Sequence, residues 1–307
     1  MRVAVTGATG TIGSAVVRAL LDRGDGVVAL TRDPDRAVQR LGSGVDARRW
    51  AEPKSEPPPA DALAGCEGVI NLLGEPIDQR WNEAAKREIR DSRVLGTRNL
   101  VEGLRSADPR PRVLVSQSAS GWYGPRGDEP VDETETVAGG DFLAQVVVAW
   151  EREARRAEEL GVRVATTRTG VVLAQGGGAL ARMLPPFRMG VGGPVAGGRQ
   201  YVPWVHVDDV AGAMLFALDA DGSSGPLNVA APEPVTNREL SKALGRVLHR
   251  PAVMPVPGFA LGLLYGEMAT VVTEGVRMIP RRLQELGYTW KRPDLEDALR
   301  AASNRAS

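Results

Sequence analysis

The chain has 307 residues, which is enough for one large domain or for a large domain and a smaller one. Its 38 basic residues balance 38 acidic ones, so the net charge excludes an overall attraction to nucleic acid or to an anionic membrane. The single cysteine, Cys66, excludes an internal disulfide framework, and the two histidines, His206 and His249, lie far apart in sequence. We therefore expect no metal site.

The beginning of the chain reads directly as a strand and lacks the apolar core and cleavage site of a signal peptide. No apolar stretch reaches the length of about 18 residues that spans a membrane. We expect a cytoplasmic protein whose partner is a small-molecule substrate of unknown identity, with no nucleic acid and no membrane as a partner.

Strand and helix patterns alternate from the first residues. Residues 3–5 form a short apolar run, residues 12–21 carry apolar side chains at helical spacing up to a stop at Gly24, and residues 27–30 form a second apolar run. Continuous apolar runs are typical of parallel strands covered on both faces. This beginning predicts a doubly wound α/β fold.

The alternation continues through the first half of the chain. We expect strands over residues 69–73, 113–115 and 162–166, a loop over the proline-rich residues 52–61, and helices over residues 82–104 and 141–161. Asp141 is a suitable N-cap for the last helix, and Gly161 a suitable stop. The elements predict a Rossmann-type doubly wound parallel sheet.

The pattern changes after Gly176, where glycine pairs interrupt the alternation. We expect residues 1–170 to form the Rossmann domain, with residues 205–230 returning to it. Residues 171–204 and 231–307 are expected to form a smaller α+β C-terminal lobe on the substrate side.

Three glycines, Gly7, Gly10 and Gly13, lie between the first strand and the first helix. Glycines at this spacing allow a tight turn, a close approach to a pyrophosphate and close packing of helix on strand, and the helix N-terminus then faces the phosphates. A glycine-rich turn without a ligand is the alternative, and the strand before and helix after the loop argue against it. The loop predicts a dinucleotide site.

The end of the second strand indicates which dinucleotide binds. An acidic residue there would bind the ribose 2′-hydroxyl of NAD, but this chain has Leu30, Thr31 and Arg32. The planar guanidinium of Arg32 suits a 2′-phosphate and can stack on adenine. Asp33 weakens this interpretation slightly, and a solvated surface arginine is the alternative. We expect NADP(H) as the cofactor.

Several segments resemble a known family. TGATGTIG, VINLLG, SQSASGWYG and VHVDDVAGAM resemble the short-chain dehydrogenase/reductase superfamily in its extended, epimerase-like form. GEPIDQRW, GGRQYVPWVHVDD and LGRVLHRPAVMPVPGFALGLLYGEMA resemble one atypical subgroup. Its members are described only as epimerase-family or cell-division-inhibitor-like proteins and end in a C-terminal domain of unknown function. The resemblance covers essentially the whole chain.

The resemblance implies roles for individual residues. The residues implied at the phosphates are Gly7, Thr9, Gly10, Thr11, Ile12 and Gly13. Arg32 would meet the 2′-phosphate, and Leu72, Leu73 and Gly74 would pass over the adenosine ribose. Ser116 and Ser118 would border the nicotinamide pocket, with Ser118 as the best match to the catalytic serine. The superfamily also forms homodimers often, so a homodimer is possible here.

The usual catalytic dyad of the superfamily, Tyr-x-x-x-Lys on the helix after the serine strand, is absent from the sequence. That helix offers Phe142 with Val146, or Leu143 with Val147, at the two plausible registers. The chain has no lysine between Lys86 and Lys242. The ordinary proton chemistry therefore lacks its residues.

Two functions remain open. An NADP(H)-dependent oxidoreductase or sugar-nucleotide-epimerase-like enzyme would need another acid, for which Tyr123, Asp141 and Glu151 are candidates beside Ser118. Tyr123 follows the serine strand closely, although a buried aromatic most often only packs. The alternative is a non-catalytic protein that binds or senses NADP(H), since the fold alone does not decide function.

The remaining polar candidates have structural alternatives. Arg80, Trp81 and Arg93 follow a strand end that would face the ligand and could hold an anionic substrate, or they belong to a helix surface. We interpret His206, Asp208 and Asp209 as structural residues. The charged run over residues 151–159 is most simply a solvated helix face.

Overall fold

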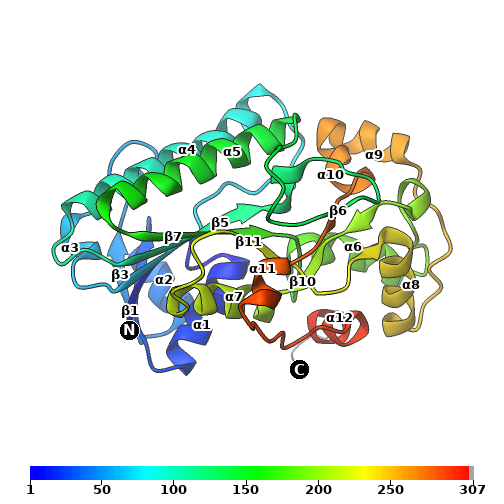
Figure 1. Cartoon of the computed structure of the whole chain (residues 1–307). Helices are drawn as coiled ribbons and strands as arrows, with labels where there is room; N and C mark the ends of the chain where they lie inside the picture. The colour runs from blue at the N-terminus through cyan, green and yellow to red at the C-terminus, as the bar shows by residue number, and fades with distance from the viewer. Residues whose placement is uncertain (304–307) are drawn as a thin grey trace.

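The structure is a computed structural model that describes residues 1–303, apart from the side chain of Leu264. The last four residues of the expected C-terminal lobe, 304–307, lie outside the described residues. The centre is a seven-stranded parallel sheet in the order β11-β7-β5-β4-β1-β2-β3 (Figure 1). Its strands are β1 (Arg2–Thr6), β2 (Gly26–Thr31), β3 (Val45–Arg49), β4 (Gly68–Asn71), β5 (Val113–Ala119), β7 (Arg163–Thr169) and β11 (Gly225–Val229). The predicted Rossmann-type fold is confirmed.

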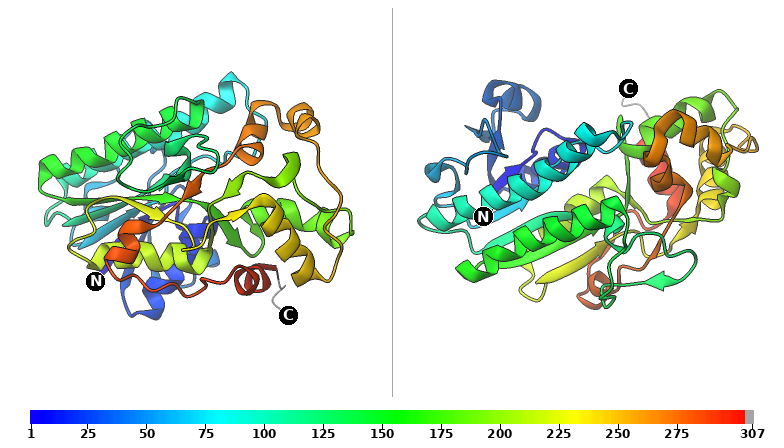
Figure 2. Two further views of the ribbon diagram at one scale, coloured as in Figure 1. Left: turned by 45° about the vertical axis from the view of Figure 1, so that its right-hand side comes forward. Right: turned by 90° about the horizontal axis from the view of Figure 1, so that it is seen from above.

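Helices cover both faces of this sheet. On one face, α1 (Thr11–Asp22) and α7 (Val207–Asp219) pack on Val3 and Val5 of β1. On the other face, α3 (Ala60–Leu63), α4 (Glu83–Ser106) and α5 (Phe142–Arg155) pack on the side containing Ala4. Figure 2 shows α4 and α5 running side by side over the sheet. The alternation of one short strand thus supplies side chains to two separate cores.

Some elements differ from the predicted bounds. The serine strand continues through Ala119, because its polar residues Ser116 and Ser118 are fully buried and find partners inside the protein. Asp141 caps α5 as predicted, its Oδ1 accepting a hydrogen bond of 3.0 Å from the backbone N of Ala144. The helix then tightens into the 3₁₀-helix η2 (Arg156–Leu160) before Gly161. The helix α2 (Pro34–Leu41) and the charged edge strand β3 had no predicted counterpart.

The segment after β7 builds a lobe with its own core. Its helices α6 (Gly178–Arg188), α8 (Asn237–Leu248) and α12 (Leu295–Ser303) pack around the parallel pair β8 (Val171–Ala174) and β10 (Trp204–His206). The smaller elements after β7 are η3 (Ala196–Gly198), β9 (Tyr201–Val202), β12 (Val235–Thr236), α9 (Gly258–Tyr265), η4 (Gly266–Ala269), α10 (Thr270–Thr273), β13 (Arg277–Met278) and α11 (Arg281–Glu285). One short strand from earlier in the chain, β6 (Pro130–Val131), pairs with β13. A smaller α+β region therefore accompanies the main sheet.

Later segments also return to the main sheet. β11 pairs with β7, and α7 packs against α1. The hydroxyl of Tyr288 donates to the backbone oxygen of Asp209 at 3.1 Å, which ties the tail to α7. The exact division into two domains stays a prediction.

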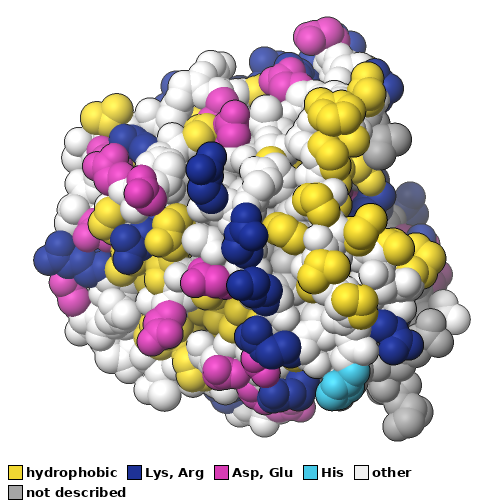
Figure 3. Space-filling view, turned by 90° about the vertical axis from the view of Figure 1, so that its right-hand side faces the viewer, with side chains coloured by type: hydrophobic (Ala, Val, Ile, Leu, Met, Phe, Trp, Pro, Cys, Tyr) yellow, Lys and Arg dark blue, Asp and Glu magenta, His cyan; other side chains and the backbone are white. Residues whose placement is uncertain are grey.

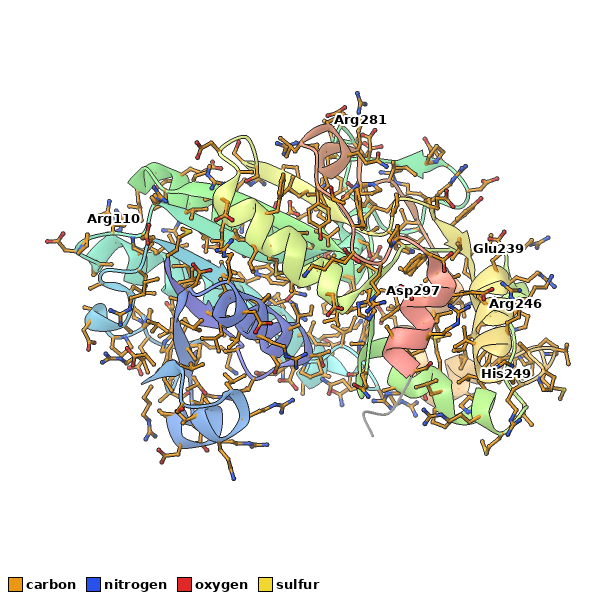
Figure 4. All side chains as sticks on the ribbon, turned by 90° about the horizontal axis from the view of Figure 1, so that it is seen from below. Arg110, Glu239, Arg246, His249, Arg281 and Asp297 are labelled. Atoms are coloured by element: carbon orange, nitrogen blue, oxygen red, sulfur yellow. The ribbon has the colours of Figure 1, made fainter. Side chains whose placement is uncertain are left out.

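The surface of the lobe gathers apolar and basic side chains on one face (Figure 3). Its largely exposed apolar side chains are Met189, Val191, Val253, Met254, Phe259 and Leu263. Arg246 of α8 donates to Glu296 of α12 at 2.6 Å, and Figure 4 shows it between these two helices. Across residues 1–303, the structure contains no helix with the length and apolar character needed to cross a membrane.

Candidate functional site

Gly7 and Gly13 form a backbone cradle at the carboxyl end of β1. Gly7 has a φ of +60°, and a Cβ there would lie 2.5 Å from the backbone oxygen of Leu72. A Cβ on Gly13 would lie 2.1 Å from the oxygen of Gly7. Since only glycine fits at these two positions, strand, turn and helix can approach as closely as a dinucleotide-binding loop requires.

The first turn of α1 begins beside this cradle. Its N-cap residue, Gly10, provides no side-chain cap, and the first turn has no acidic residue. Gly10 and Thr11 are exposed, whereas Thr9 and Ile12 are half-buried. An uncapped helix N-terminus presents unpaired N–H groups and the positive end of the helix dipole, so it attracts phosphate. The residues present therefore fit a pyrophosphate.

A second glycine loop lies against this helix start. Gly177, in the turn between β8 and α6, is so close that a Cβ there would lie 2.5 Å from Oγ1 of Thr11. Two segments more than 160 residues apart thus meet at the phosphate loop. The sequence pattern indicated a flexible or tightly turned connection at residues 176–178 and did not predict its contact with the phosphate loop.

Arg32 directly follows β2 and is exposed. In residues 1–303 its side chain has no hydrogen bond or ion pair, so its guanidinium is available to a ligand. The neighbouring Asp33 instead caps α2, its Oδ1 accepting from the backbone N of Arg36 at 3.1 Å. The sequence pattern missed Arg49, which lies opposite Thr31 in the β2–β3 register and is likewise exposed.

Asn71 at the end of β4 joins three neighbouring elements. Its Oδ1 accepts a hydrogen bond of 2.9 Å from Oγ1 of Thr6, and its Nδ2 donates to Oγ1 of Thr97 at 2.9 Å. Nδ2 also donates to Oγ of Ser116 at 3.2 Å. All four side chains are fully buried, so Ser116 lies inside this network rather than on an open surface.

The same network fixes the segment that follows β4. The backbone N of Leu72 donates to Oγ1 of Thr6 at 2.8 Å, and the Leu72 side chain is buried. Leu73 packs against Gly96 of α4, while Gly74 is exposed. Residues 72–74 therefore form a fixed edge beside the glycine cradle.

Ser118 belongs to a buried polar network. Its Oγ donates to Oε1 of Glu151 at 2.6 Å. Arg168 holds the same carboxylate with two bonds, from Nε to Oε1 at 2.9 Å and from Nη2 to Oε2 at 3.0 Å. The Arg168 guanidinium also stacks on Trp122 at 3.7 Å from the ring centroid. The hydroxyl of Ser118 is therefore hydrogen-bonded to a buried ion pair.

Tyr123 lies in the same network and is fully buried. Its hydroxyl donates toward Oδ1 of Asn228 at 2.8 Å and toward the backbone oxygen of Asp132 at 3.0 Å, and it accepts from Nη1 of Arg168 at 3.2 Å. Burial raises the pKa of this phenol to about 12, although Arg168 opposes the shift. The side chain packs edge-on against Trp122.

Two apolar side chains of α5, Leu143 and Val147, lie near the segment that follows the serine strand. A Cβ on Gly121, in the 3₁₀-helix η1 (Ser120–Tyr123), would lie 3.5 Å from Cβ of Leu143. Val147, one turn later, packs in the same apolar cluster as Tyr123. These contacts favour the register of Leu143 with Val147, and the absence of the usual dyad stays a prediction.

The interpretation of residues 151–159 as a solvated helix face is wrong for two of its members. Glu151 and Glu153 are each 4% exposed at the side chain. Glu153 pairs with Arg98 of α4 and with Arg156 at 2.9 and 3.0 Å. A carboxylate can be buried when arginines from other elements replace its water.

The other polar candidates have structural roles. Nδ1 of His206 accepts from the backbone N of Asp208 at 3.2 Å and caps α7. The carboxylate of Asp209 accepts from the backbone N atoms of Lys291 and Arg292.

Cys66 is buried, which raises the pKa of its thiol. Within the described residues, no cluster of three or more His, Cys, Asp or Glu side chains could hold a metal ion.

The segment after residue 74 packs against the first turn of α5. Trp81 meets Phe142 edge-on, with 5.3 Å between the ring centroids. Arg93 of α4 stacks on Trp150 at 5.3 Å, and Arg80 is exposed. Lys86 of α4 pairs with Glu267 of η4, which joins this helix to the C-terminal region.

Comparisons with known proteins identify both parts of the chain. The NAD dependent epimerase/dehydratase family matches residues 3–230, and a domain of unknown function (DUF1731) matches residues 256–302. The chloroplastic SDR39U1 homolog of Arabidopsis thaliana, an epimerase family protein, is 41% identical, with 98% of this chain and 86% of that protein covered. Epimerase family protein SDR39U1 of Mus musculus is 38% identical, with 98% and 99% covered.

Solved structures agree with these relatives. The crystal structure of human epimerase family protein SDR39U1 (isoform 2) with NADPH has a TM-score of 0.87 and 35% identity, covering 98% of this chain and 99% of that chain. UDP-glucuronic acid 4-epimerase from Bacillus cereus, at 17% identity and a TM-score of 0.78, shares the fold alone. The predicted resemblance to an atypical extended short-chain dehydrogenase with a C-terminal domain of unknown function is confirmed. The chain belongs to the NAD dependent epimerase/dehydratase family.

Proposed function

We propose that this chain binds NADP(H) across the carboxyl ends of β1, β2 and β4. The observation that carries the proposal is the pairing of an uncapped, exposed helix start at Gly10 with an exposed arginine, Arg32, that has no protein partner in residues 1–303. The human relative crystallised with NADPH supports the same cofactor. When bound, this cofactor supplies or accepts a hydride.

The individual roles follow the described geometry. The pyrophosphate would meet Gly7, Thr9, Gly10, Thr11, Ile12 and Gly13. Arg32 would bind the 2′-phosphate through its planar fork, with Arg49 as a second cation nearby. Leu72, Leu73 and Gly74 would flank the adenosine ribose, and Ser116 would hold the strand beneath the nicotinamide end.

The test is a fluorescence titration with NADPH and with NADH. We expect Arg32→Ala to weaken NADPH binding by about tenfold or more, since hydrogen bonds to charged groups are strong, and to leave NADH binding nearly unchanged. Arg40→Ala is the control, because Arg40 is an exposed arginine in the last turn of α2. Equal affinity for both nucleotides, or equal loss of both in Arg32→Ala, would overturn the proposal.

Two candidate functions differ in whether the protein uses the bound cofactor in a reaction. An oxidoreductase or epimerase-like enzyme needs a proton donor in place of Leu143 and Val147, and Ser118 and Tyr123 stay the candidates. A non-catalytic NADP(H)-binding or sensing protein is favoured by one observation: both candidates are fully buried within hydrogen-bonded networks.

A panel of carbonyl compounds separates these functions through NADPH absorbance. Consumption that is lost in Ser118→Ala or Tyr123→Phe would establish the enzyme. Tight NADPH binding without consumption across the panel would establish the binding protein.

A cytoplasmic location and a homodimer are further proposals, which cell fractionation and sedimentation would test.

A further inference from the structure

Arg93 of α4 is a cation with few partners. Its Nη1 donates to the backbone oxygens of Glu75 and Ile89 at 2.9 and 3.0 Å. Within residues 1–303, no carboxylate forms an ion pair with it, and Nε and Nη2 donate no hydrogen bond. Burial lowers the pKa of Arg93 to about 10, although the charge of Glu75 opposes the shift. It remains a cation at neutral pH, and the charge of Glu75 acts on it only from beyond ion-pair distance.

The unused Nε–Nη2 edge is the one that other arginines of this chain use for carboxylates. Arg168 holds both oxygens of Glu151 through Nε and Nη2, and Arg98 holds both oxygens of Glu153 in the same way. Such a side-on fork fits carboxylate and phosphate oxygens. Arg93 therefore presents a fork of the same kind with no acid in it.

The Nε–Nη2 edge of Arg93 keeps contact with solvent. The fully buried side-chain atoms that lack a partner in residues 1–303 lie on Ser14, Trp204, Ser241 and Arg277. Nε and Nη2 of Arg93 are not among them, so each retains contact with solvent. A nitrogen that keeps this contact can exchange water for an anion.

The surroundings hold the fork in place beside the nucleotide-binding edge. The guanidinium stacks on Trp150 of α5, which fixes its plane. A Cβ on Gly74 would lie 2.9 Å from Cζ, 3.0 Å from Nη2 and 3.2 Å from Nε, so only glycine lets the chain pass this close to the guanidinium. Gly74 ends the segment proposed to flank the cofactor, so the fork lies along the same edge.

We propose that Arg93 binds the anionic group, a carboxylate or a phosphate, of the substrate of this protein. The inference rests on the proposed NADP(H) site, because that site is what makes this edge the substrate side. Arg80, in the same loop after Gly74, is a further exposed cation, and its Nε lies 4.0 Å from the place of a Cβ on Gly266. The substrate class is therefore an acid rather than a neutral carbonyl compound.

The experiment titrates the full chain with inorganic phosphate, acetate and neutral acetamide, by calorimetry. It is run on NADPH-saturated protein, in which Arg32 is occupied, and on free protein. We expect phosphate or acetate to bind and acetamide not to bind, and the tighter anion identifies the group. Arg93→Met should weaken anion binding by about tenfold or more, and Arg93→Lys, which keeps the charge but not the fork, should restore part of it.

The controls separate this inference from the proposed function. Arg90→Met removes an exposed arginine of the same helix that pairs with Asp91, and it should bind anions as the parent does. Failure of NADPH to bind overturns the proposed function, whereas the free-protein titration still tests Arg93. No anion binding to the parent, or equal binding by the parent and both Arg93 variants, overturns the inference. If Arg93→Met does not fold, the test compares anion binding by the parent with anion binding by Arg93→Lys, and anion binding with acetamide binding in the parent. Weaker anion binding by Arg93→Lys than by the parent supports the inference, and equal binding overturns it.

Discussion

The hydroxyl of Ser118 donates a hydrogen bond of 2.6 Å to Oε1 of Glu151, and the serine has no exposure to solvent. In the superfamily that the sequence resembles, the serine at this strand end serves catalysis. Here it completes the shell of a buried carboxylate that Arg168 also holds. The same strand position therefore supports a structural ion pair in this conformation.

This relationship predicts the cost of removing the carboxylate charge. Glu151→Gln would leave Arg168 buried without its counter-ion, and breaking a buried ion pair costs about 3–5 kcal/mol of unfolding free energy. Urea unfolding would measure the loss. Glu159→Gln is the control, because Glu159 is exposed on η2 and should change stability by less than about 0.5 kcal/mol. Equal stability of the two variants would contradict the prediction.

A second prediction concerns the glycine cradle. Gly13→Ala should abolish NADPH binding and lower the melting temperature, because the new Cβ would lie 2.1 Å from the backbone oxygen of Gly7. Gly10→Ala should be milder, since its Cβ would lie 3.2 Å from the same oxygen and its φ of −72° suits alanine. Thermal unfolding and NADPH titration of both variants give the comparison. Matching affinities in the two variants would argue that the cradle does not hold the nucleotide.

The sheet and the phosphate loop could be predicted from the sequence because their signals are local. Apolar runs such as residues 27–30 specify buried parallel strands, and Gly7, Gly10 and Gly13 need no distant partner to be read. The edge strand β3 lacked this signal, since Asp46, Arg48 and Arg49 give it a charged pattern.

The interior of the site could not be predicted in the same way. Glu151 and Glu158 belong to one charged run, yet the first is buried and the second is exposed. The difference comes from Arg168 on β7, whose approach depends on the folded sheet. The contact between Gly177 and Thr11 is similarly non-local, because the β8–α6 turn must fold back over α1.

That contact gives a third prediction. Gly177→Ala should weaken NADPH binding with little change in the melting temperature, because its Cβ would displace the side chain of Thr11 or the glycine loop itself. The loop packs on the exposed helix start rather than in a core, so the fold does not depend on it. NADPH titration and thermal unfolding measure the two effects. Unchanged affinity would mean that this loop lies away from the nucleotide.

Two buried glutamates should respond to pH with opposite signs. Burial alone would raise the pKa of Glu153, but its hydrogen bonds and ion pairs with Arg98 and Arg156 hold it below the ordinary value. Burial raises the pKa of Glu133, although backbone N–H donors such as that of Asn228 oppose the shift. The charged form is therefore favoured by folding at Glu153 and disfavoured at Glu133.

The sign of each effect follows from proton linkage. Glu153 stabilises the fold above its unfolded pKa of about 4.3, and this contribution is lost as pH falls through its lower folded pKa. Glu153→Gln should therefore be less stable than the parent at pH 7, with a gap that narrows toward about pH 3. For Glu133, the folded pKa lies above the unfolded one, so ionisation on raising the pH costs stability. Relative to the parent, Glu133→Gln should thus gain stability as pH rises from about 4 to 7. Urea unfolding of both variants across this range checks the signs, and parallel pH profiles would contradict the assignment.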